Sequence, residues 1–170
     1  MAFAVNFERL YDEHAPALFA FLINLTRNET DAVDLLQEVF CKIAQRPALL
    51  DGVKELRGFL LRMAHNLAID FMRRNSSRER KHESLGAEQH CVFAPCADPD
   101  TQSFRQALSL ALEELPCDQR AIVHLKLWEG FTFEAIAKAL EISPNTAASR
   151  YRYGLDKLRE RLRPLYDEIK

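Results

Sequence analysis

Hydrophobic residues recur at helical spacing along most of this chain, and the pattern stops in one long internal stretch. From Phe7 to Leu25, apolar side chains return every three or four residues, as on the buried face of an amphipathic helix. Between Asn75 and Gln102 the period is lost, and Ser, Gly, Pro and Asp accumulate. A structureless stretch of this length is uncommon inside one compact domain. We therefore predict an all-α protein with a helical domain at 1–80, a flexible linker at 81–102 and a second helical domain at 103–170.

Charge is segregated along the chain, although the net charge of the 170 residues is only −2. Residues 1–56 are rich in Asp and Glu, whereas a basic stretch follows, and residues 150–163 are basic again. The cations of the first basic stretch are Arg57, Arg62, Arg73, Arg74, Arg78, Arg80 and Lys81. Because local fields rather than the net charge attract nucleic acids, this pattern permits DNA binding.

No apolar run approaches the roughly 20 residues that a membrane-spanning helix requires, so we expect a cytoplasmic protein without membrane insertion. Its four cysteines are irregularly spaced, which favours free thiols in that compartment. Cys91 and Cys96 lie near His82 and His90 in the linker, but this spacing matches no strong zinc motif. We predict no metal, no cofactor and no catalysis, and a metal- or thiol-dependent enzyme remains the alternative that these residues leave open.

Two further helices are expected in the first domain. The helix at 28–45 has a predicted buried stripe and, opposite it, an acidic and polar face. We expect no group of the same domain to pair with this face, so it is available to a partner. That stripe is Ala32, Val33, Leu36, Val39, Phe40 and Ile43. The helix from residue 55 has the apolar stripe Leu56, Leu60, Met63, Leu67 and Phe71 beside the polar stripe Arg62, Asn66, Asp70 and Arg73. Phe59 falls within the polar stripe, where it either packs at the rim or contacts a flat partner.

The second domain ends in a predicted helix-turn-helix. Helices are expected at 103–115 and 117–129, and then a pair at 133–140 and from 144 onward, with Thr132 and Ser143 as caps. Core candidates are Ile122, Val123, Leu125, Leu127 and Trp128, and on the last helix Ala147, Ala148, Tyr151, Leu155, Leu158 and Leu162. Its outer face would carry Asn145, Thr146, Ser149, Arg150, Arg152, Tyr153 and Lys157, which suits the major groove of DNA. Tyr153 either contacts DNA or covers the helix surface.

Three segments resemble the sigma factors of the extracytoplasmic-function (ECF) group, which contain only the second and fourth conserved sigma regions. DAVDLLQEVFCKIA at 31–44 is similar to the family's helix that docks on the polymerase clamp. LRGFLLRMAHNLAIDFMRR at 56–74 resembles the segment that melts and reads the −10 element, and residues 112–162 resemble the region that binds the −35 element. Phe59, Ala135 and Glu141 stand where the family often has Trp, Glu and Gly, respectively.

The resemblance implies an RNA polymerase sigma factor that directs promoter recognition, promoter melting and transcription initiation. Its implied partners are the polymerase core, through the clamp coiled coil and the flap, promoter DNA and an anti-sigma factor. The implied core-polymerase residues are Asp31, Asp34, Gln37, Glu38 and Phe40. The implied −10 residues are Arg57, Phe59, Arg62, Asn66, Asp70, Arg73 and Arg74, with the loop 46–57 receiving a flipped base. Because helix-turn-helix pairs also occur in stand-alone regulators of duplex DNA, that alternative stays open.

Overall fold

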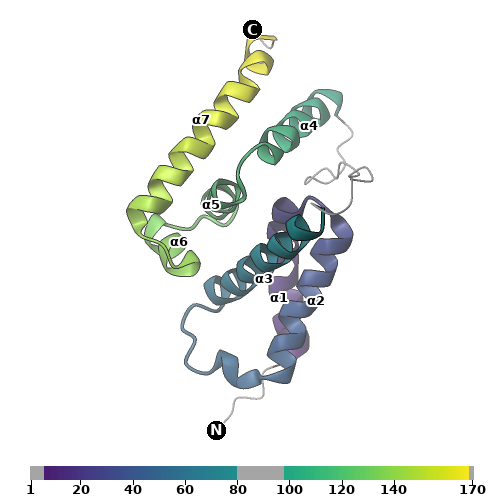
Figure 1. The fold of residues 1–170 in the computed structure, drawn as a ribbon, viewed down its shortest axis with the longest axis vertical. Helices are drawn as coiled ribbons and strands as arrows, with labels where there is room; N and C mark the ends of the chain where they lie inside the picture. Colours follow the sequence, from purple (N-terminus) through teal and green to yellow (C-terminus); the bar gives the residue numbers. More distant parts are fainter. Residues whose placement is uncertain (1–5, 80–97, 169–170) are drawn as a thin grey trace. The chain divides into compact units, whose positions relative to one another are not determined.

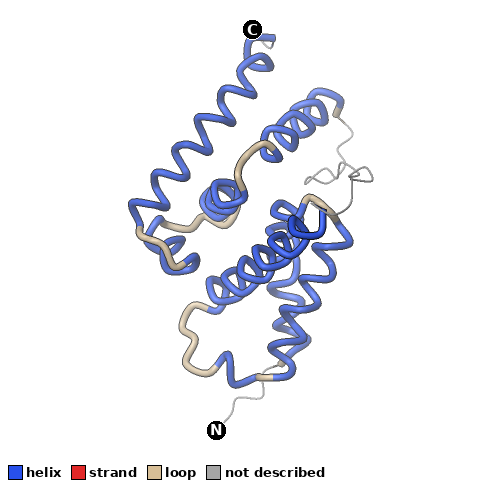
Figure 2. Tube along the Cα trace, viewed as in Figure 1, coloured by secondary structure: helices blue, strands red, loops and turns tan. Residues whose placement is uncertain are grey.

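A computed structural model describes residues 6–79 and 98–168 of the chain. These residues form α-helices and one short 3₁₀ helix, and they contain no strand (Figures 1 and 2). The elements of the first part are α1 (Phe7–Thr26), α2 (Glu29–Gln45), the 3₁₀ helix η1 (Pro47–Leu50) and α3 (Leu56–Glu79). Those of the second part are α4 (Pro99–Glu113), α5 (Cys117–Leu127), α6 (Phe133–Leu140) and α7 (Pro144–Glu168).

The chain divides into two compact units, Met1–Glu88 and Gln89–Lys170. The predicted all-α, two-domain fold class is therefore confirmed. The helix α4 begins at Pro99, earlier than the helix predicted at 103–115 and inside the stretch expected to be linker. Asp98 caps this helix by accepting a hydrogen bond from the backbone N–H of Thr101 at 3.1 Å, and Pro99 suits the first helical position. The last residues of the presumed linker, 99–102, are thus the first turn of a helix.

The first unit is a three-helix assembly in which α1 packs on α2 and α3, and α2 packs on α3. Phe21 and Leu22 of α1, Val39 of α2 and Leu60 of α3 are fully buried. Asn28 caps α2 as predicted, since its side-chain oxygen accepts a hydrogen bond from the N–H of Asp31 at 3.0 Å. Each helix buries one face in this core, and the opposite faces of α2 and α3 are exposed to solvent.

The second unit is organised around α7, which contacts α4, α5 and α6. Leu112, Leu115, Val123, Leu158 and Leu162 form its core cluster together with Ala111. In Figure 1, α7 is the long yellow-green helix, with α6 beside its beginning. The α7 helix is therefore held along its length by the rest of the unit.

A glycine sets the closest approach of α5 and α7. A Cβ atom added to Gly154 would lie 2.9 Å from Cγ2 of Val123 and 3.6 Å from Cβ of Gln119. Val123 is completely buried, and a close-packed core offers its side chain no free space into which to move. Only a residue without a side chain therefore allows α7 to lie this close to α5.

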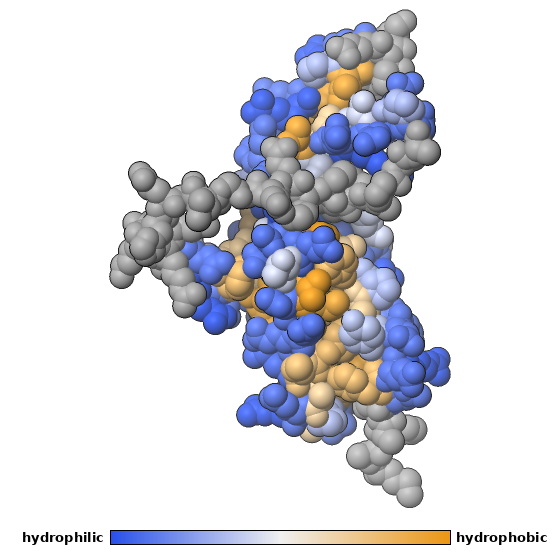
Figure 3. All heavy atoms as spheres, turned by 90° about the vertical axis from the view of Figure 1, so that its right-hand side faces the viewer, coloured by the Kyte–Doolittle hydropathy of each residue, from blue (hydrophilic) through white to orange (hydrophobic). Residues whose placement is uncertain are grey.

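Three residues predicted to be buried are exposed. Val33 is 36% exposed, Leu127 is 53% exposed and Trp128 is 41% exposed. Leu127 and Trp128 lie at the end of α5, where the chain leaves the core, and the Trp128 ring stacks on His124 at 5.4 Å instead. Conversely, Leu35 and Leu61 were not predicted to be buried, yet they are part of the first core. In the view of Figure 3, hydrophobic patches interrupt a mostly hydrophilic surface.

Candidate nucleic-acid and partner interfaces

The α6–α7 pair is a helix-turn-helix whose caps are those expected from the sequence. Thr132 accepts a hydrogen bond from the N–H of Ala135 at 3.1 Å, and Ser143 accepts one from the N–H of Thr146 at 3.0 Å. Between the two helices Glu141 is left-handed, with φ 58° and ψ 42°, and the N–H of Ile142 donates to the carbonyl of Ala137 at 3.0 Å. This conformation costs a non-glycine residue about 1 kcal/mol. The tight turn joins α6 to α7, and Asn145, Arg152 and Tyr153 in the N-terminal half of α7 are exposed.

The predicted −35 residues lie on the accessible side of α7, and several already make contacts within the protein. Asn145, Arg152, Tyr153 and Lys157 are exposed, and Thr146, Ser149 and Arg150 are half-buried. The Ser149 hydroxyl lies within hydrogen-bond distance of the carbonyls of Asn145, at 2.9 Å, and Thr146, at 3.1 Å. Arg152 lies over the Tyr153 ring, with its guanidinium carbon 5.5 Å from the ring centre. Arg150 forms an ion pair with Asp118 of α5, which sequence analysis did not foresee.

The solvent face of α2 is acidic, as predicted. Asp34, Gln37 and Glu38 are exposed, and Asp31 is half-buried. Partial burial, reinforced by the nearby carboxylate of Asp34, raises the pKa of Asp31. Glu38 pairs with Lys42 one turn later at 3.5 Å, a surface contact of little energetic weight.

Phe40 does not belong to this acidic face. It is only 4% exposed, and its ring packs against Tyr11 at 4.8 Å and Phe7 at 6.1 Å. The prediction that Phe40 contacts the polymerase directly therefore requires correction, because its side chain is enclosed between α1 and α2. Phe40 thus packs α2 against α1 on the side opposite the acidic face.

The polar face of α3 carries the other predicted site. The predicted residues at exposed positions are Arg57, Asn66, Asp70, Arg73 and Arg74, whereas Phe59 and Arg62 are half-buried. At about 1.5 Å per residue, the exposed positions extend along roughly 25 Å of helix. The preceding loop contains η1 and then Gly52, whose φ of 73° reverses the chain, and Leu49 in this loop is 38% exposed.

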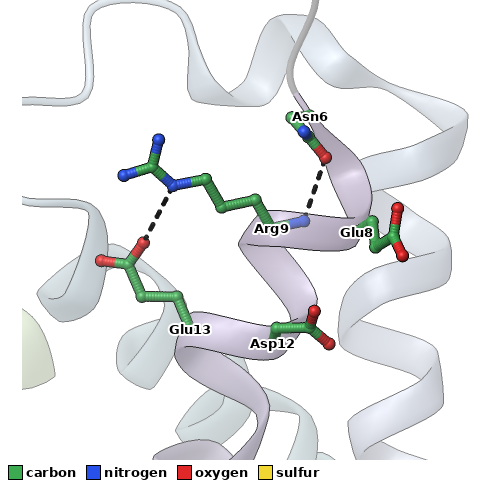
Figure 4. A pocket seen from close by; sticks show the side chains of 5 residues that line it. All are labelled: Asn6, Glu8, Arg9, Asp12 and Glu13. Atoms are coloured by element: carbon green, nitrogen blue, oxygen red, sulfur yellow. Dashed lines mark hydrogen bonds and ion pairs between the residues drawn. The ribbon is translucent and has the colours of Figure 1, made fainter.

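Two shallow pockets occur in the first unit. The first lies at the start of α1 and is lined by Asn6, Glu8, Arg9, Asp12 and Glu13, of which Arg9 pairs with Glu13 at 3.9 Å (Figure 4). The second is more apolar and lies between α1 and α2, beside Tyr11, Pro16, Phe19 and Val33.

The described residues also bear on two alternatives. They contain no group of three His, Cys, Asp or Glu residues placed to bind a metal ion, and the linker residues His82, His90, Cys91 and Cys96 lie outside the described part. None of the helices at 6–79 and 98–168 combines the length and apolar character of a membrane span.

Comparison with known proteins identifies the family. Residues 10–78 match the model of Sigma-70 region 2, and residues 105–158 match that of Sigma-70 region 4. The sigma factor CarQ of Myxococcus xanthus is 32% identical over 166 residues, which are 96% of this chain and 92% of CarQ. The ECF sigma factor SigL of Mycobacterium tuberculosis is 30% identical, over 92% of this chain and 88% of SigL. The chain belongs to the ECF RNA polymerase sigma factors.

A solved structure supports the same fold for this sigma factor. The sigma factor RpoE of Bartonella quintana, crystallised with the anti-sigma factor NepR, matches with a TM-score of 0.76. The match covers 93% of this chain and 97% of that one, at 24% identity. The region 2 match spans α1 to nearly the end of α3, and the region 4 match runs from α4 into α7. Family membership favours a sigma factor over a stand-alone regulator.

The two described thiols of this sigma factor are expected to differ in reactivity. Cys41 is exposed on α2, whereas Cys117 is half-buried and burial raises its pKa, with Arg120 opposing and Asp118 reinforcing the shift. A raised pKa keeps the Cys117 thiol protonated at neutral pH, and the thiolate is the reactive form. In a Cys91→Ser, Cys96→Ser background, iodoacetamide at pH 7.5 should therefore label Cys41 about tenfold faster, as measured by peptide mass spectrometry. Equal labelling rates would contradict the burial of Cys117.

Proposed function

We propose that this sigma factor directs promoter recognition, promoter melting and transcription initiation by using three surfaces on two units. The acidic face of α2, formed by Asp31, Asp34, Gln37 and Glu38, docks on the polymerase core. The proposed partner is a basic coiled coil of the clamp, since a cationic helix complements this face. The observation that carries the proposal is that the first unit exposes faces of opposite charge on two different helices.

The basic face of α3 contacts the −10 element in this proposal. Arg57, Arg73 and Arg74 are exposed and would neutralise phosphates, while Asn66 and Asp70 offer hydrogen-bonding groups to bases. The loop 46–57 would receive an unstacked base, which offsets a few kcal/mol of unstacking. Because phosphate contacts release counterions, promoter binding should weaken steeply as the salt concentration rises.

The N-terminal half of α7 contacts the −35 element in the major groove. Asn145, Arg152 and Tyr153 are exposed there, and Arg150 offers guanidinium donors from a half-buried position. Each bidentate contact to a base would contribute about 1–3 kcal/mol of discrimination. The polymerase, which would also contact the second unit through its flap, holds the two modules together, so individually weak contacts become effectively intramolecular.

Three further points belong to this proposal. The protein catalyses no reaction itself, and it acts in the cytoplasm, where the polymerase works. An anti-sigma factor controls it by covering its binding surfaces, and the crystallisation of the similar sigma factor RpoE in complex with the anti-sigma factor NepR supports such a partner. None of these steps uses a cofactor.

The deciding experiment adds the purified full chain to sigma-free core polymerase with sheared genomic DNA of the source organism. Sequencing the transcripts should reveal a set of start sites that share a bipartite upstream element and that core polymerase alone does not use. In the same mixture, core polymerase should slow the alkylation of Cys41, since this thiol lies on the solvent side of α2. Tight binding of the free chain to duplex DNA, without any initiation, would instead indicate a stand-alone regulator.

A further inference from the structure

The guanidinium of Arg150 is tied to a neighbouring helix. Its Nη1 lies 3.3 Å from Oδ2 of Asp118, in the first turn of α5, and the two side chains are 36% and 52% exposed. The pair therefore joins two helices at a partly solvated site. Arg159 of α7, by contrast, pairs within its own helix, with Asp156 at 3.4 Å.

The ion pair restrains the Arg150 side chain but does not use all the hydrogen-bond donors of its guanidinium. A guanidinium has five N–H donors in a fixed planar fork, and the ion pair uses only Nη1. Other donors of the guanidinium can bond a base edge or a phosphate, while the ion pair favours one orientation of the side chain. A side chain restrained before binding loses less entropy when it binds, so the same contact with DNA becomes stronger and more selective.

Among the residues that the structure describes, no other helix restrains Arg152 or Ser149 in this way. Arg152 lies over its neighbour Tyr153, and Ser149 bonds within its own helix. Asp118 itself brings a negative charge close to the surface proposed to face DNA, where it repels phosphates. Asp118 also lies in the first turn of α5, where a carboxylate interacts favourably with the helix dipole. Its contact with Arg150 is the feature that links it to the surface proposed to face DNA.

We propose that Asp118 is a specificity-determining residue of the −35 interface, which acts by positioning Arg150 and does not itself contact DNA. This inference rests on the proposed function of α7. It predicts that removing the carboxylate has two separable effects. Binding to all sequences becomes slightly stronger because repulsion is lost, whereas discrimination between the cognate −35 element and its variants falls.

The test uses holoenzyme assembled from core polymerase and the full chain. The probes are the strongest promoter fragment found on genomic DNA and its single-base −35 substitutions, and the readout is the ratio of open-complex formation on cognate and substituted fragments. Asp118→Ala should lower this ratio about fivefold at the positions that Arg150 reads, and Arg150→Ala should lower it further. Asp118→Asn should fall between Asp118→Ala and the parent, because an amide oxygen still accepts a hydrogen bond without carrying charge.

A double variant and a matched control separate positioning from a structural role. In the Arg150→Ala background, Asp118→Ala should change the ratio no further, since its effect passes through Arg150. Glu114→Ala breaks another ion pair that joins α7 to the preceding part of the unit, Arg161–Glu114 at 2.6 Å, and should leave the ratio unchanged. Urea unfolding followed by the fluorescence of Trp128, the single tryptophan, shows that each variant is folded.

Three results would overturn the inference: an unchanged ratio in Asp118→Ala, an unchanged ratio in Arg150→Ala, or additive losses in the double variant. In each case the parent holoenzyme still initiates, so the proposed function stands. If the parent chain itself opens no promoter with core polymerase, the proposed function fails, and the role of Asp118 fails with it.

Discussion

Replacing both Asp34 and Glu38 with arginine is expected to weaken binding to core polymerase by about 100-fold or more. Both side chains are exposed on α2, so the variant should fold normally. The loss of the Glu38–Lys42 pair costs only about 0.5 kcal/mol, because it is an exposed contact within one helix. The large effect arises because arginine places like charges against a basic partner. Titration of fluorescently labelled core polymerase with the full chain measures it.

A matched control carries the same charge change on another helix of the same unit. Glu8 and Glu13 are exposed on α1, and their joint replacement with arginine should change core affinity less than about threefold, an effect of long-range charge alone. Equal losses in the two variants would indicate general electrostatic attraction, and the proposed docking face on α2 would then be wrong. Holding the ionic strength constant is essential, since screening changes both results.

Replacing Gly154 with leucine is expected to destabilise the second unit by about 3 kcal/mol or more. Even the first atom of a side chain would lie 2.9 Å from Cγ2 of the fully buried Val123, so α7 must move away from α5. The gain in helix propensity over glycine, about 1 kcal/mol, does not offset this displacement. Urea unfolding followed by Trp128 fluorescence measures the change in this unit alone, because the single tryptophan lies there.

A double-mutant cycle tests the cause. Gly154→Ala and Val123→Ala should each destabilise the unit by about 1–3 kcal/mol, the first by overpacking and the second by leaving a cavity. Together they should cost clearly less than the sum, since the new methyl group occupies space that the valine vacates. Strict additivity would show that the two positions do not meet, and that the close approach of α5 and α7 is wrong.

The sequence was sufficient wherever a feature depends on residues close together in the chain. The spacing of apolar residues predicted the helices, and their interruption after Asn75 predicted two units. The caps Asn28, Thr132 and Ser143 were predicted from residue type, because a cap bonds to an N–H only three residues away. The family resemblance rested on such local patterns too, and the matched regions agree with it.

The burial predictions that failed concern residues at the end of a helix or at the border of its apolar face. Periodicity assigns a residue to a side of one helix, but it does not say where a neighbouring helix ends. Trp128 and Leu127 follow the apolar pattern of α5, yet they lie beyond the core that covers its earlier turns. Periodicity placed Phe40 in the buried stripe of α2, whereas the family resemblance assigned it to the polymerase. The packing of α1 against α2 encloses its ring, as the periodicity predicted.

By itself, the sequence determined the helical class, the two-unit organisation and which face of α2, α3 and α7 carries charge, since these follow from the period of a single helix and from local hydrogen bonds. Only the tertiary structure decided that Asp118 meets Arg150 and that Gly154 lies against Val123. Such pairs join residues far apart in the chain. Their distances depend on how closely and at what angle α5 and α7 pack, and the side chains of the whole core determine that geometry together.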